Sequence, residues 1–297
     1  MSAPVVFDRP LLRRHRRRAR ALGPATFLLD RAADELAERL AAVVRTFDHA
    51  VDLGTPTDAL RTRLAGRLGL GAVIGVGSDL ESDGARPRVV ADEEALPFAE
   101  GSLDLVVSAL ALQSVNDLPG TLLQVRRALK PDGLFLAAML GGATLTELRQ
   151  SFAAAETEVE GGVSPRVFPF ADVRDMGALL QRAGFALPVT DVDRLTVRYA
   201  SPFVLMQDLR RMGATNALHE RRHTPLRRAT LMRMAEIYAE RFADPDGRVR
   251  ATFEIVWLSG WAPHPDQQQP LRPGSARTRL ADALGTRELP AGEKAGH

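Results

Sequence analysis

Apolar residues in the first half of the chain follow two spacings, one typical of helices and one typical of buried strands. Helical spacing predicts helices over 25–44, 57–68 and 118–129. Short continuous apolar runs predict the strands of a parallel sheet that is covered on both faces. These runs are 49–53, 72–76, 88–91, 103–109 and 134–140. Strands and helices that alternate in this way indicate βαβ units and a doubly wound sheet.

The second half of the chain predicts an edge hairpin and an insertion. Helical spacing continues over 145–159 and 171–183, and the runs 188–199 and 251–261 alternate as strands at a sheet edge do. Between these strands, 201–248 is predicted to be a helical insertion. The expected fold is therefore α/β: a Rossmann-like, doubly wound, seven-stranded sheet, mostly parallel, with an antiparallel edge hairpin and the helical insertion.

The same patterns divide the chain into three parts. Residues 1–45 are predicted to be an N-terminal helical segment, and 46–262 the α/β domain that includes the insertion. Within this domain the sequence Lys-Pro-Asp-Gly at 130–133 predicts a turn. Pro, Gln, Arg and Gly dominate 263–297, which we expect to be a mostly flexible tail.

Composition narrows the range of possible chemistry. The chain has 297 residues and a net charge of +2, with acids and bases interspersed, which does not favour nucleic-acid binding. The absence of Cys excludes disulfides, thiolate metal sites and a Cys nucleophile. His219 and His223 have the i,i+4 spacing of zinc proteases, but they lie in an Arg-packed stretch that ends before Pro225. No metal site is therefore predicted.

The N-terminal stretch 11–23 is rich in arginine. No apolar run follows it as in a secretory signal, and no run in the chain reaches the roughly 18 residues that span a bilayer. We interpret the stretch as an amphipathic helix whose basic face is solvated or meets a partner. The alternative is contact with an anionic partner or a membrane surface. The expected location is cytoplasmic, with peripheral association at the inner membrane as the alternative.

Polar residues follow three of the expected strands. Asp52, Asp92 and Ser108 fall at strand ends. Because the carboxyl ends of parallel strands meet at one edge, and ligands of such sheets bind there, these residues predict a nucleotide-sized pocket.

Several long strings resemble one family. VVADEEALPFAEGSLDLVVSALALQSVNDLP, followed by LKPDG, is similar to the class I S-adenosylmethionine-dependent methyltransferases. VFDRPLLRR, MLGGATLTELRQSFAAAETEVEGGVSPRVFPF, LMQDLRRMGATNAL and VRATFEIVWLSGWAPH extend the resemblance to the methyltransferase-like assembly factors of respiratory complex I. The malonyl-carrier-protein methyltransferases of biotin synthesis are more distantly similar.

This resemblance implies roles for the residues at the sheet edge. The Asp92 carboxylate and the backbone of Glu93 would bind the adenine of S-adenosylmethionine, and Leu96 and Leu110 would flank the base. The backbone near Ser108 and Ala109 would hold the methionine end. No catalytic residue can be named from the sequence.

The first loop of the expected pocket departs from the family. The resemblance implies that Asp52 orders this loop and binds the ammonium group of the cofactor. Where the family has glycines, this chain keeps only Gly54 and has Pro56 and Asp58. Proline removes an N–H and fixes φ, while Asp58 adds bulk and charge, so both changes are expected to weaken cofactor binding.

Two further departures lie elsewhere in the expected pocket. Gly77 stands where an acid would bind the ribose hydroxyls, although Asp79 follows two residues on and is the alternative candidate. Gln113 stands where related enzymes often carry His, and an amide cannot act as a general base near neutral pH.

Three functions remain open. The first is an S-adenosylmethionine-dependent methyltransferase that acts on a protein subunit in complex I assembly, with a partly degenerate cofactor site. The second is a non-methylating complex I maturation factor, either an arginine hydroxylase or a chaperone. The third is a catalytically inactive binding protein.

Overall fold

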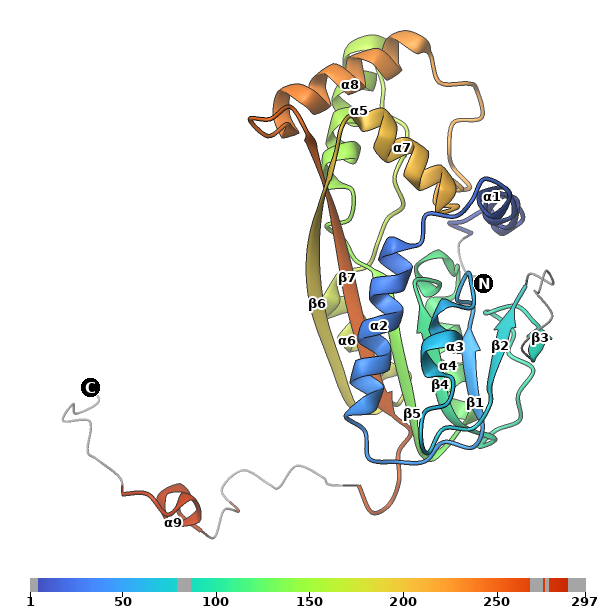
Figure 1. Ribbon diagram of the computed structural model, residues 1–297, viewed down its shortest axis with the longest axis vertical. Coiled ribbons are helices and arrows are strands. Elements are labelled where there is room, and N and C mark those ends of the chain that lie inside the picture. Colours follow the sequence, from blue (N-terminus) through green and yellow to red (C-terminus); the bar gives the residue numbers. More distant parts are fainter. Residues whose placement is uncertain (1–4, 79–86, 268–274, 276–277, 288–297) are drawn as a thin grey trace. The chain divides into compact units, whose positions relative to one another are not determined.

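The computed structural model describes residues 5–78, 87–267, 275 and 278–287 (Figure 1). The chain divides into two compact units, Met1–Pro263 and His264–His297. The second unit contains one short described helix, α9 (Leu280–Leu284). All other described elements belong to the first unit.

The first unit is built on a seven-stranded sheet in the order β3-β2-β1-β4-β5-β7-β6. The first five strands are parallel, whereas β7 is antiparallel to both of its neighbours, β5 and β6. The strands are β1 (Ala50–Leu53), β2 (Val73–Gly77), β3 (Arg88–Val90), β4 (Leu103–Ala109), β5 (Leu129–Leu140), β6 (Ala186–Tyr199) and β7 (Val249–Trp261). This arrangement confirms the α/β fold, the mostly parallel sheet and the antiparallel edge hairpin.

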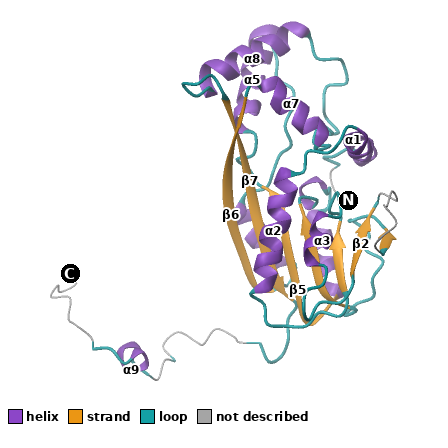
Figure 2. Ribbon diagram, viewed as in Figure 1, coloured by secondary structure: helices purple, strands orange, loops and turns teal. Residues whose placement is uncertain are grey.

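Helices cover both faces of the sheet (Figure 2). Apolar residues of α2 (Phe27–Ala41) and α3 (Ala59–Leu64) pack on one face, against side chains such as Leu105 and Val107. On the other face α4 (Leu118–Ala128) and α6 (Val173–Arg182) pack on residues such as Val106 and Phe135. The buried continuous runs predicted for the central strands follow from this double cover.

The expected insertion forms a helical layer beyond one end of the sheet. It contains α7 (Pro202–Arg211) and α8 (Arg228–Phe242), which pack with α5 (Thr146–Glu160) around the ends of β6 and β7. The N-terminal helix α1 (Arg9–Ala21) lies next to α7 (Figure 1). Ser201 begins α7, because its side chain accepts a hydrogen bond from Val204 N.

The prediction that 130–133 form a turn before the fifth strand is wrong. These residues lie within β5, whose pairing with β4 shifts register between Leu103 and Leu105. Asp132 N donates to Ala262 O at 3.1 Å, and Ala262 N donates to Gly133 O at 2.8 Å. The turn residues therefore pair with the residue that directly follows β7, a contact between segments far apart in the sequence.

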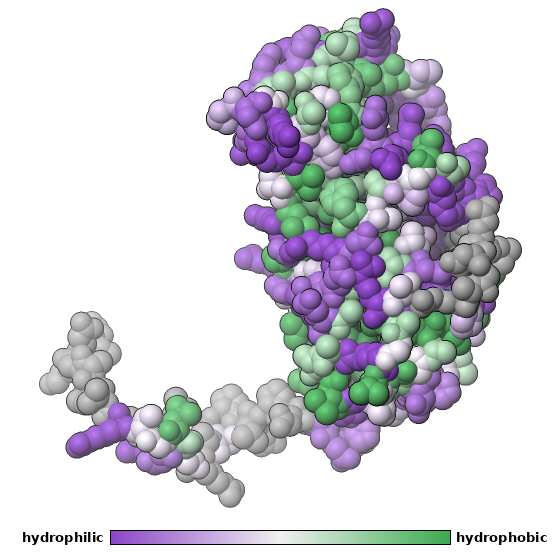
Figure 3. All heavy atoms as spheres, viewed as in Figure 1, coloured by the Kyte–Doolittle hydropathy of each residue, from purple (hydrophilic) through white to green (hydrophobic). Residues whose placement is uncertain are grey.

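The surface shows no extended apolar band on the face seen in Figure 3, where hydrophobic residues lie in several separate groups among hydrophilic ones. Within the described residues, no helix has both the length and the apolar character needed to cross a membrane.

Candidate functional site

A small cavity of about 110 Å³ lies at the carboxyl ends of β1 and β2. Its floor includes backbone and side chains of the sheet edge, and its opposite wall comes from α1. We call it the arginine-lined pocket. Its lining residues are Arg13, Arg16, Arg20, Asp52, Gly54, Thr55, Pro56, Arg61, Gly75, Val76, Gly77, Ser78, Arg88, Val89, Val90 and Glu93.

The loop after β1 is held by a short polar chain. Asp52 is buried and accepts a hydrogen bond from Thr55 Oγ1, which in turn accepts from Ala109 N at 3.0 Å. Ser108 Oγ donates to Leu53 O at 2.7 Å. Ser108 and Ala109 therefore support the loop from the neighbouring strand β4. Thr55 was not singled out from the sequence, because its role depends on the adjacency of β1 and β4.

Burial dominates the electrostatics of Asp52. It raises the pKa of the Asp52 carboxyl to about 7, against the opposing effects of the Thr55 hydrogen bond and the nearby Arg61 and Arg88 guanidiniums. A substantial fraction of this group is therefore neutral near physiological pH.

Two features of position 54 favour glycine: its backbone conformation and its close packing. Its φ is +72°, in the left-handed region, and a Cβ there would lie 2.9 Å from Glu93 Oε1 and 3.1 Å from Ala111 Cβ. Both the backbone conformation and the packing therefore favour glycine.

We expect Gly54→Ala to lower the free energy of unfolding by about 2–3 kcal/mol, because backbone strain and a steric clash add. Gly66→Ala is the matched control: Gly66 has φ +75°, but a Cβ there would meet nothing within 4 Å. The free energies of unfolding in urea of the two variants separate the backbone strain, which both variants share, from the steric clash, which only Gly54→Ala has. Equal losses would contradict the role given to the Glu93 contact.

Asp58, which replaces a family glycine, belongs to a cluster of charges. It forms ion pairs with Arg61 and Arg88. Arg61 is only 3% exposed, and its Nε also lies 3.6 Å from Asp52 Oδ2. A Cβ on Gly75 would lie 2.7 Å from Arg61 Nη1, so the guanidinium rests directly on the β2 backbone. The charge that Asp58 adds is therefore compensated by arginines of α3 and β3.

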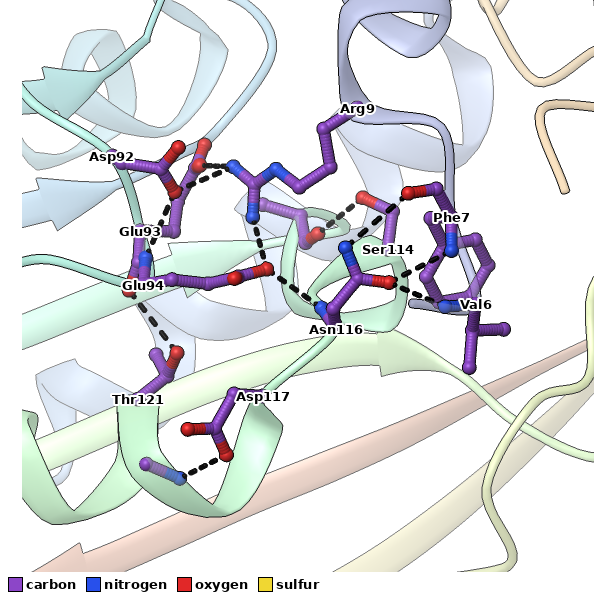
Figure 4. A network of polar contacts seen from close by, with 12 residues as sticks. Val6, Phe7, Arg9, Asp92, Glu93, Glu94, Ser114, Asn116, Asp117 and Thr121 are labelled. Atoms are coloured by element: carbon purple, nitrogen blue, oxygen red, sulfur yellow. Dashed lines mark hydrogen bonds and ion pairs between the residues drawn. The ribbon is translucent and has the colours of Figure 1, made fainter. Parts of the chain in front are cut away.

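The acidic turn after β3 is bound by a residue of α1 (Figure 4). Arg9 Nη2 lies 2.9 Å from Asp92 Oδ1 and pairs also with Glu93, while Nη1 donates to Glu94 Oε1 at 2.8 Å. Burial disfavours the charge of Arg9, but attraction to Glu93 and Asp92 outweighs it and raises the pKa of the guanidinium. One cation thus holds three carboxylates.

Asn116 fixes the segment that precedes Arg9 (Figure 4). Its Oδ1 accepts from Val6 N at 2.8 Å and from Phe7 N at 2.7 Å, and its Nδ2 donates to Phe7 O at 3.2 Å. Asn116 N donates to Glu94 Oε1 at 2.7 Å. The N-terminal segment and the acidic turn are therefore parts of one hydrogen-bonded network.

The structure brings some of the expected cofactor residues together and separates others. Asp52, Gly54 and Glu93 line the arginine-lined pocket. Leu96 packs against the core, with its N–H donating to Gln124 Oε1. Asp79 lies outside the described residues.

The residues that the sequence interpretation missed are mainly arginines of α1. The sequence predicts that the basic face of this helix is solvated or meets a partner, and Arg14 and Arg17 are exposed. Arg13, Arg16 and Arg20, however, line the pocket. Their spacing of three and four residues is the signal that could have indicated an inward face.

A second, larger cavity of about 270 Å³ lies beneath the helical insertion. We call it the apolar pocket. Most of its described lining residues are aliphatic or aromatic, and none is acidic. Gln113 lines it, donating through Nε2 to Leu110 O at 2.8 Å, while its buried Oε1 has no hydrogen-bond partner among the described residues. Representative lining residues are Leu12, Leu28, Leu140, Leu148, Phe152, Phe168, Met206, Leu209 and Phe253.

Neither pocket offers a metal centre among the described residues, where no group of three or more His, Asp or Glu side chains could hold an ion. His219 and His223 lie in a turn and the loop after it, so their i,i+4 spacing does not place them on one helical face.

The residues of the arginine-lined pocket do not fit S-adenosylmethionine. Arg9 holds the Asp92 carboxylate that the adenine amino group would need, and among the described residues β2 ends at Gly77 with no acid in the position expected for binding the ribose. Five arginines line the pocket, whereas the ligand, which carries a sulfonium, an ammonium and a carboxylate group, is a net cation. The volume of about 110 Å³ is also well below the ~300 Å³ at the lower end of small-molecule sites.

Comparison with known proteins assigns the fold to a class. A family model described as a methyltransferase domain matches residues 51–137. The solved structure of YcgJ from Bacillus subtilis is 16% identical, with a TM-score of 0.52 over 77% of this chain and 98% of that chain. The chain is thus an α/β protein with the fold of the class I methyltransferases.

Sequence similarity narrows the class to one family. Arginine-hydroxylase NDUFAF5, mitochondrial, from Danio rerio is 40% identical over 289 residues, which are 93% of this chain and 89% of the relative. The chain belongs to the NDUFAF5 arginine-hydroxylase family. A malonyl-[acyl-carrier protein] O-methyltransferase from Gallionella capsiferriformans is 41% identical over 179 residues, which are 60% of this chain and 58% of that protein.

Proposed function

We propose that this chain is a maturation factor for a protein subunit of respiratory complex I, and that it acts without transferring a methyl group. The observation that carries the proposal is the similarity to NDUFAF5, which extends over 93% of the chain. The malonyl-carrier methyltransferase covers only 60% of the chain. Arginine hydroxylation, the activity in the name of the NDUFAF5 relatives, is the reaction we assign to it. This reaction converts a C–H bond to C–OH, so it requires dioxygen as the oxidant and an external donor of two electrons that reduces the second oxygen atom to water.

The poor fit to S-adenosylmethionine supports a reaction other than methylation. Methyl transfer requires the sulfonium and the acceptor to be positioned together, and here the expected binding groups are engaged by arginines of the same chain. Arg9 holds the acidic turn and Arg61 covers the β2 backbone.

A second candidate is S-adenosylmethionine-dependent methylation of the same subunit. The match of residues 51–137 to a methyltransferase domain favours it. This alternative requires that α1 move away from the sheet edge, because Arg9 must release Asp92 and Glu93 before adenine can bind there.

Deletion of the gene tests the proposed function. We expect loss of assembled complex I and of NADH–quinone oxidoreductase activity, with recovery when the wild-type chain is restored. In the strain that contains the chain, mass spectrometry of the complex I subunits should then show an arginine with one added oxygen atom. In the deletion strain this modification should be absent. An added methyl group would favour the second candidate, and unchanged complex I in the deletion strain would reject both.

The place of action follows from the proposed partner. We propose that the chain acts in the cytoplasm and reaches the subunit at the inner membrane as a peripheral protein. The exposed arginines on the outer side of α1, among them Arg14 and Arg17, support this proposal, since basic surfaces are attracted to anionic lipid.

A further inference from the structure

The apolar pocket lies between several parts of the fold. Its described lining comes from α1, α5, α7, β7 and the segment after β4 that includes Leu110 and Gln113. Leu148, Leu209 and Phe253 of this lining are at most 7% exposed. None of the described lining residues is next to an undescribed segment in the chain. The walls of the cavity are therefore largely side chains of the packed interior.

A second cavity of about 100 Å³ adjoins the apolar pocket, and we call it the side cavity. Leu28, Pro56, Leu140 and Met212 line both cavities. The side cavity continues from these residues to the segment 24–26, which joins α1 to α2. Together the two cavities form a space that is longer than either one alone.

Polar side chains of the lining already have partners within the protein. Thr144 Oγ1 donates to Glu254 O at 3.1 Å, and Arg166 Nε donates to the buried Glu156 carboxylate at 2.8 Å. Gln113 Oε1 has no partner among the described residues, but this atom is itself buried. The described residues that line the two cavities include no acid. The space therefore offers a ligand mainly apolar contacts.

The volume of the apolar pocket suits an apolar ligand better than water. Protein interiors contain few voids larger than a water molecule. An apolar cavity of about 150 Å³ can stay dry and bind benzene, because each buried water needs two to four polar partners. The apolar pocket, at about 270 Å³, is nearly twice as large and approaches the ~300 Å³ of small-molecule sites.

We propose that the apolar pocket and the side cavity together bind one aliphatic chain that carries an uncharged head. The elongated space suits a chain, and a cationic head would find no acid among the described lining residues. Pro56 also lines the arginine-lined pocket, so part of the chain would lie beside the loop after β1. This ligand would be a free small molecule, distinct from the protein subunit of the proposed function.

Titration calorimetry of the full chain with 1-hexanol and 1-octanol tests the proposal. Each further methylene that is buried should strengthen binding about fourfold, so 1-octanol should bind roughly 15-fold more tightly than 1-hexanol. The dissociation constant of 1-octanol should lie below about 1 mM. Absence of 1-octanol binding, or equal affinity for the two alcohols, would overturn the proposal.

Two charged analogues of 1-octanol test the uncharged head. Octylammonium should bind at least about tenfold more weakly than 1-octanol, because the described lining has no acid to compensate its charge. Octanoate should also bind more weakly, since Arg166 is already paired with Glu156. If either charged analogue binds as tightly as 1-octanol or more tightly, the requirement for an uncharged head is wrong and the proposal is overturned.

A pair of methionine variants shows where the chain binds. Met206 lines the apolar pocket from α7, so Met206→Trp fills part of the cavity and should weaken 1-octanol binding at least about tenfold. Met232 lies in α8, is 44% exposed and lines neither cavity, so Met232→Trp should change the affinity less than about twofold. Equal affinities of the two variants would show that the chain binds elsewhere.

Urea unfolding verifies that both variants are folded. If Met206→Trp is not, Leu226→Phe replaces it, because Leu226 also lines the apolar pocket and the substitution is smaller. This variant should weaken 1-octanol binding at least about threefold, and an unchanged affinity would overturn the proposal. The measurements do not depend on complex I, so the proposed ligand and the proposed maturation role can fail independently.

Discussion

Arg9→Ala is expected to lower the free energy of unfolding by about 3 kcal/mol. Removing one partner of a buried ion pair typically costs 3–5 kcal/mol, because the remaining charge stays buried without compensation. Here the Arg9 side chain is 13% exposed, and the Glu93 side chain that it leaves behind is 4% exposed. Asp92 and Glu94 are more exposed and regain water, which places the expected loss at the lower end of the range.

Urea unfolding of Arg9→Ala, with Arg14→Ala as the control, measures this effect. Arg14 belongs to the same helix but is exposed, so its substitution should change stability by less than about 0.5 kcal/mol. A change of similar size in both variants would contradict a structural role for the Arg9 network. Arg9→Lys should recover only part of the loss, because an ammonium cannot bind three carboxylates as the planar guanidinium does.

Asp52→Asn is expected to remove a large part of the pH dependence of stability. Burial raises the pKa of folded Asp52 to about 7 from its ordinary value of 3.8. The folded state therefore binds this proton more tightly than the unfolded state, so the contribution of Asp52 to stability is highest at low pH and falls as the pH rises from 3.8 towards 7. At about 1.4 kcal/mol per pH unit, wild-type Asp52 should lower the free energy of unfolding by about 2 kcal/mol between about pH 5 and pH 7, and by about 3 kcal/mol by about pH 8.

Denaturant unfolding of wild type and Asp52→Asn at about pH 5 and pH 8 tests this expectation. Because all other groups are shared, the difference in stability between the two proteins isolates Asp52. As the pH rises from about 5 to 8, the free energy of unfolding of the wild type should fall by about 3 kcal/mol relative to that of Asp52→Asn. A difference that does not depend on pH would mean that Asp52 is ionised in the folded protein throughout this range.

Much of the fold could be predicted because its signals are local. Apolar runs and helical spacing show the strand–helix alternation that a doubly wound sheet requires. The segment at 130–133 could not be assigned in this way. Its sequence is typical of a turn, and only the hydrogen bonds between Asp132, Gly133 and Ala262 incorporate it into β5.

The site was less predictable because its contacts join distant segments. Arg9 and Glu93 are 84 positions apart, and Val6 and Asn116 are 110 apart. No spacing rule relates such residues. The changes in the first loop were visible as Pro56 and Asp58, but the compensating ion pairs with Arg61 and Arg88 appear only when the loop, α3 and β3 are placed together.

Titration calorimetry of S-adenosylmethionine into the wild-type chain tests the central claim most directly. The claim is that arginines of α1, α3 and β3 line the position of the cofactor pocket in the methyltransferase fold. Because of these arginines, the pocket does not bind the cation S-adenosylmethionine. The predicted result is no measurable binding at ligand concentrations up to about 1 mM, which corresponds to less than about 4 kcal/mol of binding free energy. Micromolar binding of S-adenosylmethionine would contradict the claim.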